Sequence, residues 1–596
     1  MRIPEDLPSM SAVIGIDFGT TNSLCAWFDG ERPAIIPNAR GQRSTPSVVA
    51  MTGRGETLVG ESAKNQAYIN PENTIAGVKR LLGGEGLLSM GGKLWRAEEI
   101  VALVLGSLKR DAEIHLALDV NRAVITAPAH FSDRERRCLA EAGRLAGLDI
   151  VRIVNEPTAA ALARAWSAIR PDGVVGVQKN LVLVYDYGGG TFDVTILERN
   201  GGDCRVLSSR GDGHLGGADL DRELRALASR FFKTKGLDLD SDRFLAQELA
   251  GAAERAKIEL SEREETSIAL AFAASGGRII HPIFELSRSQ FEDIVKPYVE
   301  RSIELVEKAL LDASVSKEEL GSLVLSGGSS RIPLVRRMLK EKLGLDPEGG
   351  VNPEEIVALG AAVSAALSPG DGRVGDRMRV RDVVSRSYGV EIDGGAFISL
   401  VRKNSPVPST YSRVFTTVSD NQDSVEIHVL QGESKLASED LSLGKFLLAG
   451  IRPAKAGLPR IKVDFSIDES DMLHVSAVDL GSGAEQAITI ADIGRGASGE
   501  SAEVLARKTS LLVDRIAELR SGLKLERGLE SELDDAVLRA RRILDSSSKR
   551  AEGEIRMLKA ELEGLVGELL ARRSEARSDE RLAAGRTATR GLGETA

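Results

Sequence analysis

Two segments of the 596-residue chain share one pattern: an apolar strand, an Asp-x-Gly turn, a threonine and a second apolar strand. The first segment, residues 13–25, carries Asp17, and the second, residues 181–197, carries Asp186, which lies 169 residues later. A repeat of this kind is typical of a duplicated half-domain. Strands expected at 123–126 and 323–326 alternate with helices expected at 133–146, 157–168, 246–260 and 291–311. The sequence therefore predicts an α/β domain with one sheet in each half.

The spacing of apolar residues changes after residue 368. Residues 368–375 have the composition of a linker. From 414 to 490 apolar and polar residues alternate strictly, as in Val425, Ile427 and Val429, which predicts a small antiparallel β domain. From 498 to about 570 the apolar spacing is helical, and residues 572–596 have no period, which is typical of a disordered tail.

The composition of the chain limits the cellular compartments and the binding partners that we expect for it. The chain carries 88 acidic and 78 basic side chains, so its net charge of −10 disfavours general binding to nucleic acid or to an anionic membrane. Its three cysteines are far apart and form no C-x-x-C pair, which fits a reducing compartment. No signal peptide and no apolar run of ~18 residues is visible. We therefore expect a soluble, cytoplasmic protein.

The two hairpins suit phosphate and Mg²⁺. Glycine lets the backbone turn tightly and brings N–H groups close to an anion, and threonine hydroxyls add donors. Aspartate carboxylates suit a hydrated Mg²⁺. One hairpin alone is explained equally well as a glycine turn in a sheet. A matched pair in two halves favours a pair of jaws that close on the β- and γ-phosphates of a nucleotide.

Three further motifs fit the same site. Residues 211–216 match G-x-G-x-x-G, but no βαβ unit with an acidic ribose ligand is clear, so a phosphate or ribose contact explains them better than a dinucleotide fold. Glu254, Lys257 and Ser261 share one helical face, although a solvated stripe is the alternative. The glycine pair 327–328 ends a strand and opens a helix, an arrangement that suits an anion or adenosine. The six scattered histidines predict no metal site.

Residues 16–23, 155–162, 185–193, 214–217 and 352–355 resemble the heat-shock-70 chaperone family of the DnaK type, and in detail its short, HscC-like bacterial members. The resemblance includes residues 420–422 and 428–433, and is strong from about 12 to 490. It implies a multidomain fold: an actin-like α/β ATPase domain with duplicated halves (1–370), an interdomain linker (371–385), an antiparallel β-sandwich substrate-binding domain (386–495), an α-helical lid (496–571) and a disordered tail (572–596).

The function that the resemblance implies is an ATP-dependent chaperone of the stress response. ATP binding and hydrolysis would switch its affinity for extended hydrophobic segments of unfolded proteins. ATP or ADP and Mg²⁺ are the expected cofactors, with K⁺ as a further candidate. A J-domain co-chaperone is an expected partner, a nucleotide-exchange factor is a further candidate, and nucleic acid and membrane are not expected.

The resemblance also implies roles for single residues. Lys79 would position the attacking water and the γ-phosphate, and Arg152 would receive the J-domain. The implied catalytic residues are Lys79, Glu156, Asp186, Thr191, Asp17 and Asp193, of which Asp17, Asp186 and Asp193 would hold Mg²⁺ through waters. The implied nucleotide-binding residues are Gly19, Thr20, Thr21, Asn22, Gly188, Gly189, Gly190, Thr191, Gly216, Gly217, Glu254, Lys257, Ser261, Gly327, Gly328, Ser329, Arg331 and Glu354. Val425, Phe415, Ile427 and Val390 would bind peptide, although core packing is the alternative, and Pro128, Arg136, Arg152 and Asp382 would carry allostery.

Two other classes share the phosphate hairpins. A sugar or acetate kinase of the actin-like superfamily and an actin-like filament protein both lack a separate β domain, so residues 414–490 argue against them. The linker offers a further expectation. As a strand, it would have Met378, Val380 and Asp382 on one face and Arg377, Arg379 and Arg381 on the other. We expect such a strand to couple the two domains.

Overall fold

The structure is a computed structural model that divides into two compact units, residues 1–490 and 491–596, which are described separately. The first unit contains two α/β sheets, their outer subdomains and a β-sandwich. The described residues are 12–167, 180–237, 239, 242–271, 274, 275, 278, 279, 281–367, 378–483, 485–489, 513, 516, 520 and 527–544.

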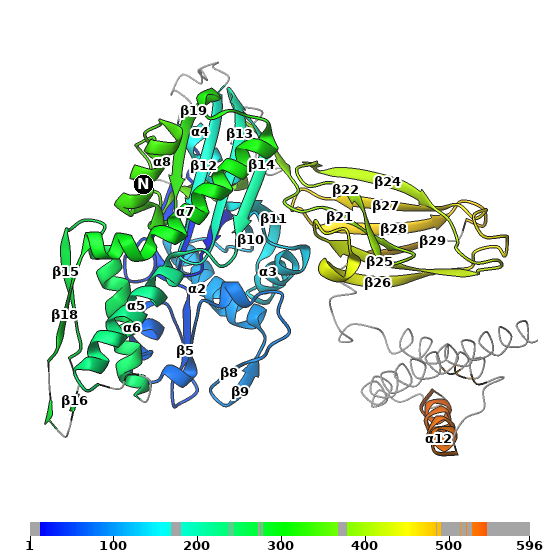
Figure 1. The fold of residues 1–596 in the computed structure, drawn as a ribbon, viewed down its shortest axis with the longest axis horizontal. Coiled ribbons are helices and arrows are strands. Elements are labelled where there is room, and N and C mark those ends of the chain that lie inside the picture. The colour runs from blue at the N-terminus through cyan, green and yellow to red at the C-terminus, as the bar shows by residue number, and fades with distance from the viewer. Residues whose placement is uncertain are drawn as a thin grey trace, which may run out of the picture. The chain divides into compact units, whose positions relative to one another are not determined.

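Two six-stranded sheets repeat one topology, which confirms the predicted duplication (Figure 1). In the first sheet β1 is parallel to β10 and forms a hairpin with β2, and in the second β12 is parallel to β19 and forms a hairpin with β13. The first sheet contains β1 (Val13–Phe18), β2 (Asn22–Phe28), β3 (Pro33–Ile36), β4 (Thr45–Pro46), β10 (Arg122–Ala127) and β11 (Asp149–Asn155). The second contains β12 (Asn180–Tyr187), β13 (Phe192–Asn200), β14 (Asp203–Asp212), β19 (Leu320–Ser326), β20 (Arg379–Val383) and β23 (Pro406–Val407).

Two helices of small residues pack together between the sheets. They are α4 (Glu156–Ser167) and α9 (Ile356–Ala366), and their buried alanines share a core with valines from both sheets. A Cβ added to Gly360 would lie 1.7 Å from the Ala159 carbonyl oxygen, and one added to Gly15 would lie 2.3 Å from the Ala362 nitrogen. Glycine therefore allows this close approach of the backbones, which sets the distance between the sheets.

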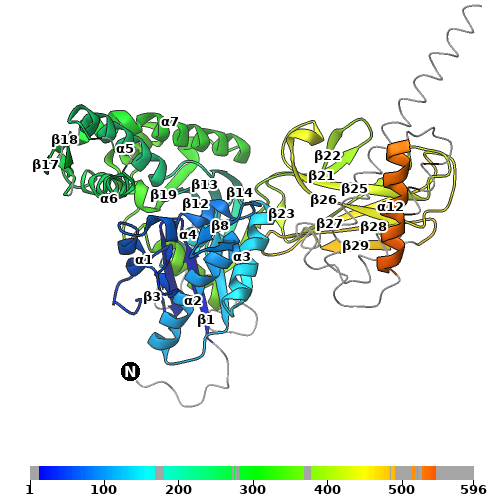
Figure 2. The ribbon, with the colours of Figure 1, turned by 90° about the horizontal axis from the view of Figure 1, so that it is seen from below.

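Other helices cover the outer faces and build two outer groups, which lie around α1 and around α5 in Figure 2 and meet at the Lys64–Glu254 ion pair. The α3 helix begins with a capping box, in which the Glu135 carboxylate accepts the Ser132 N–H at 2.7 Å. The remaining helices are α1 (Glu61–Gln66), α2 (Ala97–Leu116), α3 (Asp133–Leu145), α5 (Gly217–Thr234), α6 (Arg243–Glu259), α7 (Arg288–Ala313) and α8 (Pro333–Leu343), with 3-10 turns η1 (Pro71–Asn73), η2 (Val78–Leu81), η3 (Lys317–Glu319) and η4 (Gly328–Arg331). The short strands are β5 (Val48–Met51), β6 (Thr57–Val59), β7 (Thr74–Ala76), β8 (Leu88–Met90), β9 (Lys93–Trp95), β15 (Glu265–Ala269), β16 (Ala274–Ser275), β17 (Arg278–Ile279) and β18 (Ile283–Ser287).

The β domain is a sandwich of two four-stranded antiparallel sheets, ordered β22-β21-β25-β26 and β24-β27-β28-β29. Every second residue of β27 and β28 is buried, as the alternation predicts. The strands are β21 (Tyr388–Ile392), β22 (Ala396–Val401), β24 (Ser409–Phe415), β25 (Ser424–Gln431), β26 (Leu441–Ala449), β27 (Ile461–Ile467), β28 (Leu473–Asp479) and β29 (Glu485–Thr489), with a turn η6 (Ala437–Glu439).

Part of the expected linker forms β20, which pairs in parallel with β14. Met378 and Asp382 are buried and Val380 is half-buried, whereas Arg379 and Arg381 are exposed. The expected alternation is therefore present, while Arg377 lies outside the described residues. The Thr158 hydroxyl donates to the Asp382 carboxylate at 2.8 Å, so the linker is fastened to α4.

The turn between β27 and β28 contacts α3 and β11 of the α/β part. The Leu473 N–H donates to Asp133 at 2.8 Å, its carbonyl accepts Arg137 at 2.6 Å, and the Ser470 hydroxyl accepts the Ile153 N–H at 3.1 Å. Beside them Asp471 lies 3.4 Å from the fully buried guanidinium of Arg136. These contacts hold the β domain to the end of the first sheet.

The second unit is described mainly by α12 (Arg527–Leu544). Its buried residues Leu529, Leu533, Ala536 and Ala540 form one helical stripe. Most of the expected lid (496–571) and all of the expected tail (572–596) lie outside the described residues. Among the described helices, none is long and apolar enough to cross a membrane.

Gly360→Ala should lower the free energy of unfolding of the α/β part by about 1–3 kcal/mol, because the new methyl group forces α9 away from Ala159. Thermal and urea unfolding measure the change. Gly53→Ala is the matched control, since its Cβ would meet no atom within 4 Å. Equal stability of the two variants would contradict the close packing of α4 on α9.

The β27–β28 turn should be pH-sensitive, because burial raises the pKa of Asp471 to about 7, in spite of Arg136 and with the help of Asp382, Asp133 and Asp468. The folded protein then holds a proton that the unfolded chain has lost, so stability falls by at most about 1.4 kcal/mol per pH unit from about pH 4 to 7. Asp471→Asn should flatten this part of the stability profile between about pH 4 and 7. Glu469→Gln, in the same turn but 66% exposed, should leave it unchanged, and a profile unaltered by Asp471→Asn would contradict the assignment.

Candidate active site

A cavity of about 700 Å³ opens where β1 and β12 end, between the two halves of the α/β part. Nineteen of the residues expected to bind nucleotide or act in catalysis line it: Asp17, Gly19, Thr20, Thr21, Asn22, Lys79, Glu156, Asp186, Gly188, Gly189, Thr191, Glu254, Lys257, Ser261, Gly327, Gly328, Ser329, Arg331 and Glu354. The structure therefore gathers most of the expected set around one space.

The tips of the two hairpins touch. A Cβ added to Gly189 would lie 2.2 Å from the Thr21 hydroxyl, and one added to Gly190 would lie 2.4 Å from the Thr20 hydroxyl. Only glycine fits between the hairpins at this distance, and it leaves backbone N–H groups and threonine hydroxyls on the cavity wall. This is the jaw-like geometry that the repeated motif predicts.

Behind the hairpins, the Lys79 ammonium faces Glu156 and Asp17, and Asp186 lies next to these two carboxylates. The ammonium group of Lys79, which is only 2% exposed, lies 2.5 Å from Glu156. Burial and the charge of Glu156 raise the pKa of Asp17 to about 7, and Thr126 donates to Asp17 at 3.2 Å. Burial and the neighbouring carboxylates also raise the pKa of Asp186 well above its usual value. The cavity therefore holds more negative charge than its own lysine neutralises.

This donor set fits a hydrated Mg²⁺. In the described part of the chain no three carboxylate, histidine or cysteine groups converge tightly enough to chelate an ion directly. Asp17 and Asp186 line the cavity, so they would hold Mg²⁺ through waters, as that ion commonly binds. Burial and neighbouring carboxylates raise the pKa of Asp17 and Asp186, so a cation beside them would favour their charged forms.

Four expected residues lie behind the cavity wall and do not line it. Asp193 contacts His130 at 3.1 Å, and Gly190, Gly216 and Gly217 pack into the support of the second hairpin. The Gly217 N–H donates to the Gly188 carbonyl at 3.0 Å, and the Gly217 carbonyl accepts Lys257 at 3.1 Å. These residues support the second hairpin, and Gly188 and Gly189 form the surface of that hairpin that faces the cavity.

Two arginines near the cavity were not predicted from the sequence. Arg80 donates to the Gly190 carbonyl and pairs with Asp219 at 2.5 Å, so it fastens the second hairpin to the N-terminus of α5. Arg43 pairs with Glu355 at 2.6 Å, on the rim of the cavity. Other missed lining residues are Leu24, Ser44, Ile258, Glu262, Ser326, Ile332, Arg336, Asn352, Pro353 and Val357. The sequence offered a signal only for Arg80, because that residue is basic and lies beside a glycine motif.

Of the residues expected to carry allostery, Arg136 and Arg152 lie where the α/β part contacts the β domain. Pro128 follows β10, and Arg136 donates to Asn155 at 2.6 Å while facing Asp471. Arg152, on β11, is 22% exposed and lies 4.0 Å from Glu469. Asp382 is held by Thr158.

The expected peptide-binding residues fall into two groups. Val390 and Ile427 are at most 6% exposed, so the structure favours the core-packing role for them. Val425 and Phe415 are half-buried and belong to different sheets of the sandwich. Among the four, these two offer apolar surface to a ligand.

Two matching α/β halves, paired phosphate hairpins and a carboxylate–lysine cluster define the class of protein as a two-lobed nucleotide-binding ATPase, here joined to a β-sandwich.

Comparison with known proteins gives the family. The family model for "Hsp70 protein" matches residues 13–86 and 87–577. The chaperone protein DnaK of Thermotoga neapolitana is 42% identical over 564 residues, which are 94% of this chain and 92% of that protein. The DnaK proteins of Thermotoga petrophila and Thermotoga maritima are each 42% identical over 562 residues, with the same coverage. The chain belongs to the Hsp70 family, whose members are ATPases and ATP-dependent chaperones that bind unfolded protein segments.

Arg43→Ala should speed nucleotide dissociation several-fold, since it removes an ion pair of the kind worth up to about 1 kcal/mol from the rim of the cavity. Stopped-flow release of a fluorescent ADP measures the rate, and the difference from wild type should shrink at high salt. Arg54→Ala, at an exposed position, is the control. A rate like that of wild type at low salt would remove the Arg43–Glu355 pair from nucleotide retention.

Proposed function

We propose that ATP binds in the 700 Å³ cavity with its phosphates between the two hairpin tips, and that the carboxylate–lysine cluster catalyses its hydrolysis. The observation that carries the proposal is the buried pair Lys79–Glu156 beside Asp17 and Asp186, at the base of two touching glycine hairpins. Glu254, Lys257, Ser261 and Arg331 would contact the adenosine part.

Each residue near the phosphates would have a positioning or charge role, as phosphoryl transfer requires. The Lys79 ammonium would orient the attacking water and the γ-phosphate, while Glu156 holds that ammonium in place. Water attack on the γ-phosphorus breaks its bond to the bridging oxygen and leaves ADP and phosphate. Thr20, Thr21 and Thr191 would donate hydroxyl hydrogen bonds to phosphate oxygens. Bound Mg²⁺, held through waters by Asp17 and Asp186, would neutralise phosphate charge, and K⁺ is a further candidate cofactor. Asp193, expected in the same role, lies behind the cavity wall against His130 and would act only through its neighbours.

The β-sandwich would bind extended hydrophobic segments of unfolded proteins. Val425 and Phe415 would offer the apolar contact, with Val390 and Ile427 packed beneath, and strand-like pairing would add main-chain hydrogen bonds. ATP would change the affinity of this groove through β20 and the β27–β28 turn, since both join the two parts through Asp382 and Arg136.

Finer features belong to the same proposal. The α/β part would be an actin-like domain spanning 1–370, with the linker at 371–385, the substrate-binding domain at 386–495 and the lid at 496–571. The partners would be a J-domain co-chaperone, received at Arg152, and a nucleotide-exchange factor, in the cytoplasm. In detail the chain would be an HscC-like member.

Lys79→Ala should still bind ATP with Mg²⁺ but hydrolyse it at least about a hundredfold more slowly, because the hairpins remain and the positioning ammonium is lost. Single-turnover assays measure the chemical step. Lys79→Met, which fills the vacated space, separates loss of chemistry from loss of folding. Near-normal hydrolysis by either folded variant would remove Lys79 from the mechanism.

Val425→Phe should abolish binding of an apolar peptide and leave basal ATP hydrolysis intact, because a ring overfills a groove sized for branched side chains, at a cost of ~1–3 kcal/mol. Fluorescence anisotropy with a labelled peptide measures the affinity. Val418→Phe, at a position 64% exposed, is the control. If Val425→Phe binds peptide normally, the groove lies elsewhere.

A further inference from the structure

A histidine in the β domain is hydrogen-bonded through both of its ring nitrogens. His428 lies on β25, and its two partners lie on the strands that flank β25 in the sheet β22-β21-β25-β26. The Nδ1 atom of His428 lies 2.6 Å from the carboxylate of Glu391, on β21. The Nε2 atom lies 2.8 Å from the hydroxyl of Ser442, on β26. The three side chains therefore form one hydrogen-bonded triad across three neighbouring strands.

The chemistry of the two partners fixes where the protons of this triad lie. An ionised carboxylate only accepts hydrogen bonds, so the hydrogen between His428 and Glu391 belongs to Nδ1. In a neutral imidazole the other nitrogen then has a free lone pair, and Nε2 accepts the hydrogen of the Ser442 hydroxyl. The order carboxylate, imidazole, hydroxyl is the one that activates a serine as a nucleophile, and it is recognised by geometry and not by sequence order.

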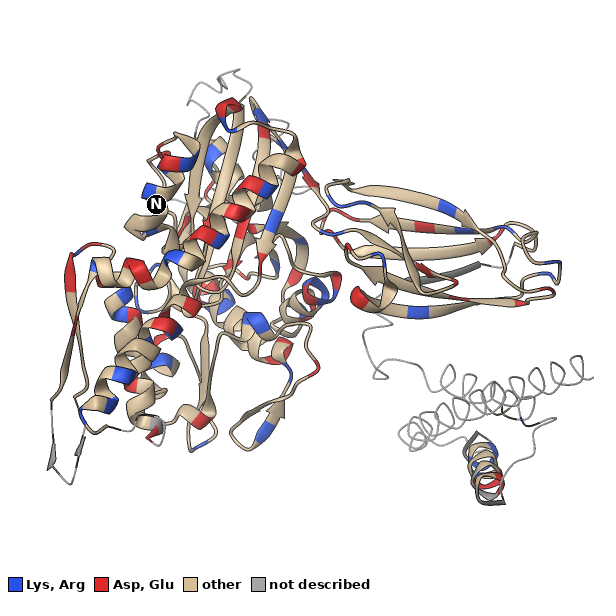
Figure 3. Cartoon of the chain, in the orientation of Figure 1, with Lys and Arg blue, Asp and Glu red and all other residues tan. Residues whose placement is uncertain are grey.

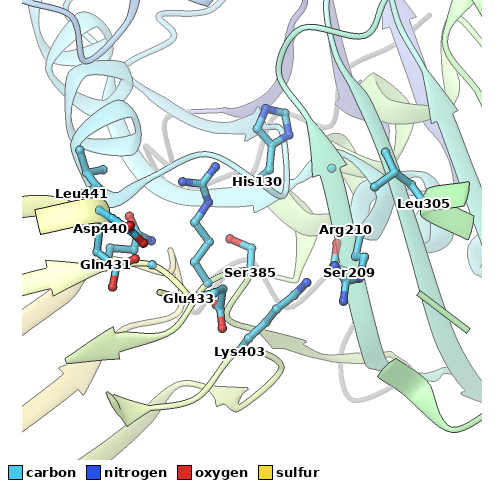
Figure 4. A pocket seen from close by; sticks show the side chains of 14 residues that line it. His130, Ser209, Arg210, Leu305, Ser385, Lys403, Gln431, Glu433, Asp440 and Leu441 are labelled. Atoms are coloured by element: carbon cyan, nitrogen blue, oxygen red, sulfur yellow. The ribbon is translucent and has the colours of Figure 1, made fainter. Parts of the chain in front are cut away.

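The serine of the triad is open to solvent, and the base behind it is sheltered. Ser442 is exposed, whereas the side chain of His428 is only 16% exposed. A cavity of about 550 Å³ between the α/β part and the β domain is lined by Leu441, the residue before Ser442 (Figure 4). Neighbouring residues of a strand point to opposite faces, and Ser442 does not line that cavity. A substrate can therefore reach the serine directly from solvent.

Main-chain donors lie beside the serine. In the described part of the chain β26 is the last strand of its sheet, so every second N–H group of β26 points away from β25. The pairing is also irregular just after Ser442, because Gly444 pairs with Val429 while Leu443 has no partner residue on β25. Such N–H groups can stabilise the negative oxygen that forms when a serine attacks a carbonyl group.

Other charged pairs of the β domain lack the hydroxyl. Figure 3 shows acidic and basic residues spread over the β-sandwich. Lys445, directly opposite His428, pairs with Glu426 at 2.8 Å. His474 lies 3.3 Å from Asp468, and among the described residues no hydroxyl lies at hydrogen-bond distance from its ring. These are ordinary surface pairs, and His474 is a matched control for His428.

We propose that Ser442 is a nucleophile and that the triad hydrolyses small esters with a good leaving group. The Ser442 oxygen attacks the carbonyl carbon of the ester, while Nε2 of His428 takes the hydroxyl proton. The bond from that carbon to the leaving oxygen then breaks, the leaving oxygen takes the proton from His428, and the acyl group stays on Ser442. Water, deprotonated by the same nitrogen, adds to the acyl carbon and releases the acid, which restores the serine. Glu391 is a positioning residue, because it acts only through His428.

The location of the triad predicts its substrates and its independence from ATP. Because Ser442 lies on an open surface, binding supplies little of the rate, so the ester itself must be reactive. None of the three residues lines the nucleotide cavity. Ester hydrolysis therefore needs neither ATP nor Mg²⁺, and it does not depend on the proposed mechanism of ATP hydrolysis.

Release of p-nitrophenolate from p-nitrophenyl acetate by the full-length chain tests the proposal. We expect a burst equal in amount to the protein, followed by slower turnover, with the acetyl group found on Ser442 by mass spectrometry. Ser442→Ala and His428→Ala should each lower the rate at least about tenfold. Glu391→Gln should lower kcat and leave KM unchanged, and Glu391→Asp should restore part of kcat. His474→Ala and Glu426→Gln should react like wild type.

The variants separate the triad from general surface reactivity and from misfolding. Lysine amines also react with this ester, and that reaction persists in Ser442→Ala, so a rate unchanged in this variant overturns the proposal. An acetyl group absent from Ser442, or equal losses in His474→Ala and His428→Ala, also overturns it. Ser442→Cys keeps a nucleophile at the same position and should still be acylated. A folded Ser442→Cys as slow as Ser442→Ala would contradict the triad as well.

Discussion

The α/β part is built around buried carboxylates whose negative charge exceeds the positive charge beside them. Asp17, Glu156 and Asp186 arrive there from β1, α4 and β12, and Lys79 is the cation that faces them. Removing several carboxylates from water is costly unless cations compensate them. The stability of the closed cavity therefore depends on whether a cation occupies it. A cation bound to ATP would balance the negative charge of the carboxylates.

Small side chains bring the two sheets close together beside this cluster. Because α4 and α9 meet through alanine and glycine, the two sheets lie on a thin layer with little side-chain interlocking. Glu156 begins α4 and Thr158 holds the linker, so one helix connects the carboxylate–lysine cluster with β20. The first turn of α4 thus lies between the carboxylate–lysine cluster and the strand that leads to the β domain.

Sequence periodicity predicted most of this fold, and the exceptions have physical causes. The duplicated hairpins, the helix near 246–260 and the alternating strands after 424 all have strong periods, and each is present. β22 was not evident, because nearly all of its residues are half-buried and show no alternation. Arg43 and Arg80 were missed for another reason. Their partners, Glu355 and the Gly190 carbonyl, lie 312 and 110 residues away, and a charge pair across that separation leaves no local pattern.

The parallel pairing of β20 with β14 has a consequence for the behaviour of the chain in a crowded solution. At Asp203, Cys204 and Arg205, β20 occupies the outer side of β14. If the linker left β14, these backbone groups would become an open sheet edge, and open edges recruit strands from other molecules. The exposed arginines of β20 would then repel those of another released linker, which would discourage the two strands from pairing. Release of β20 would therefore expose the sheet to self-association, and β20 prevents this while it is paired with β14.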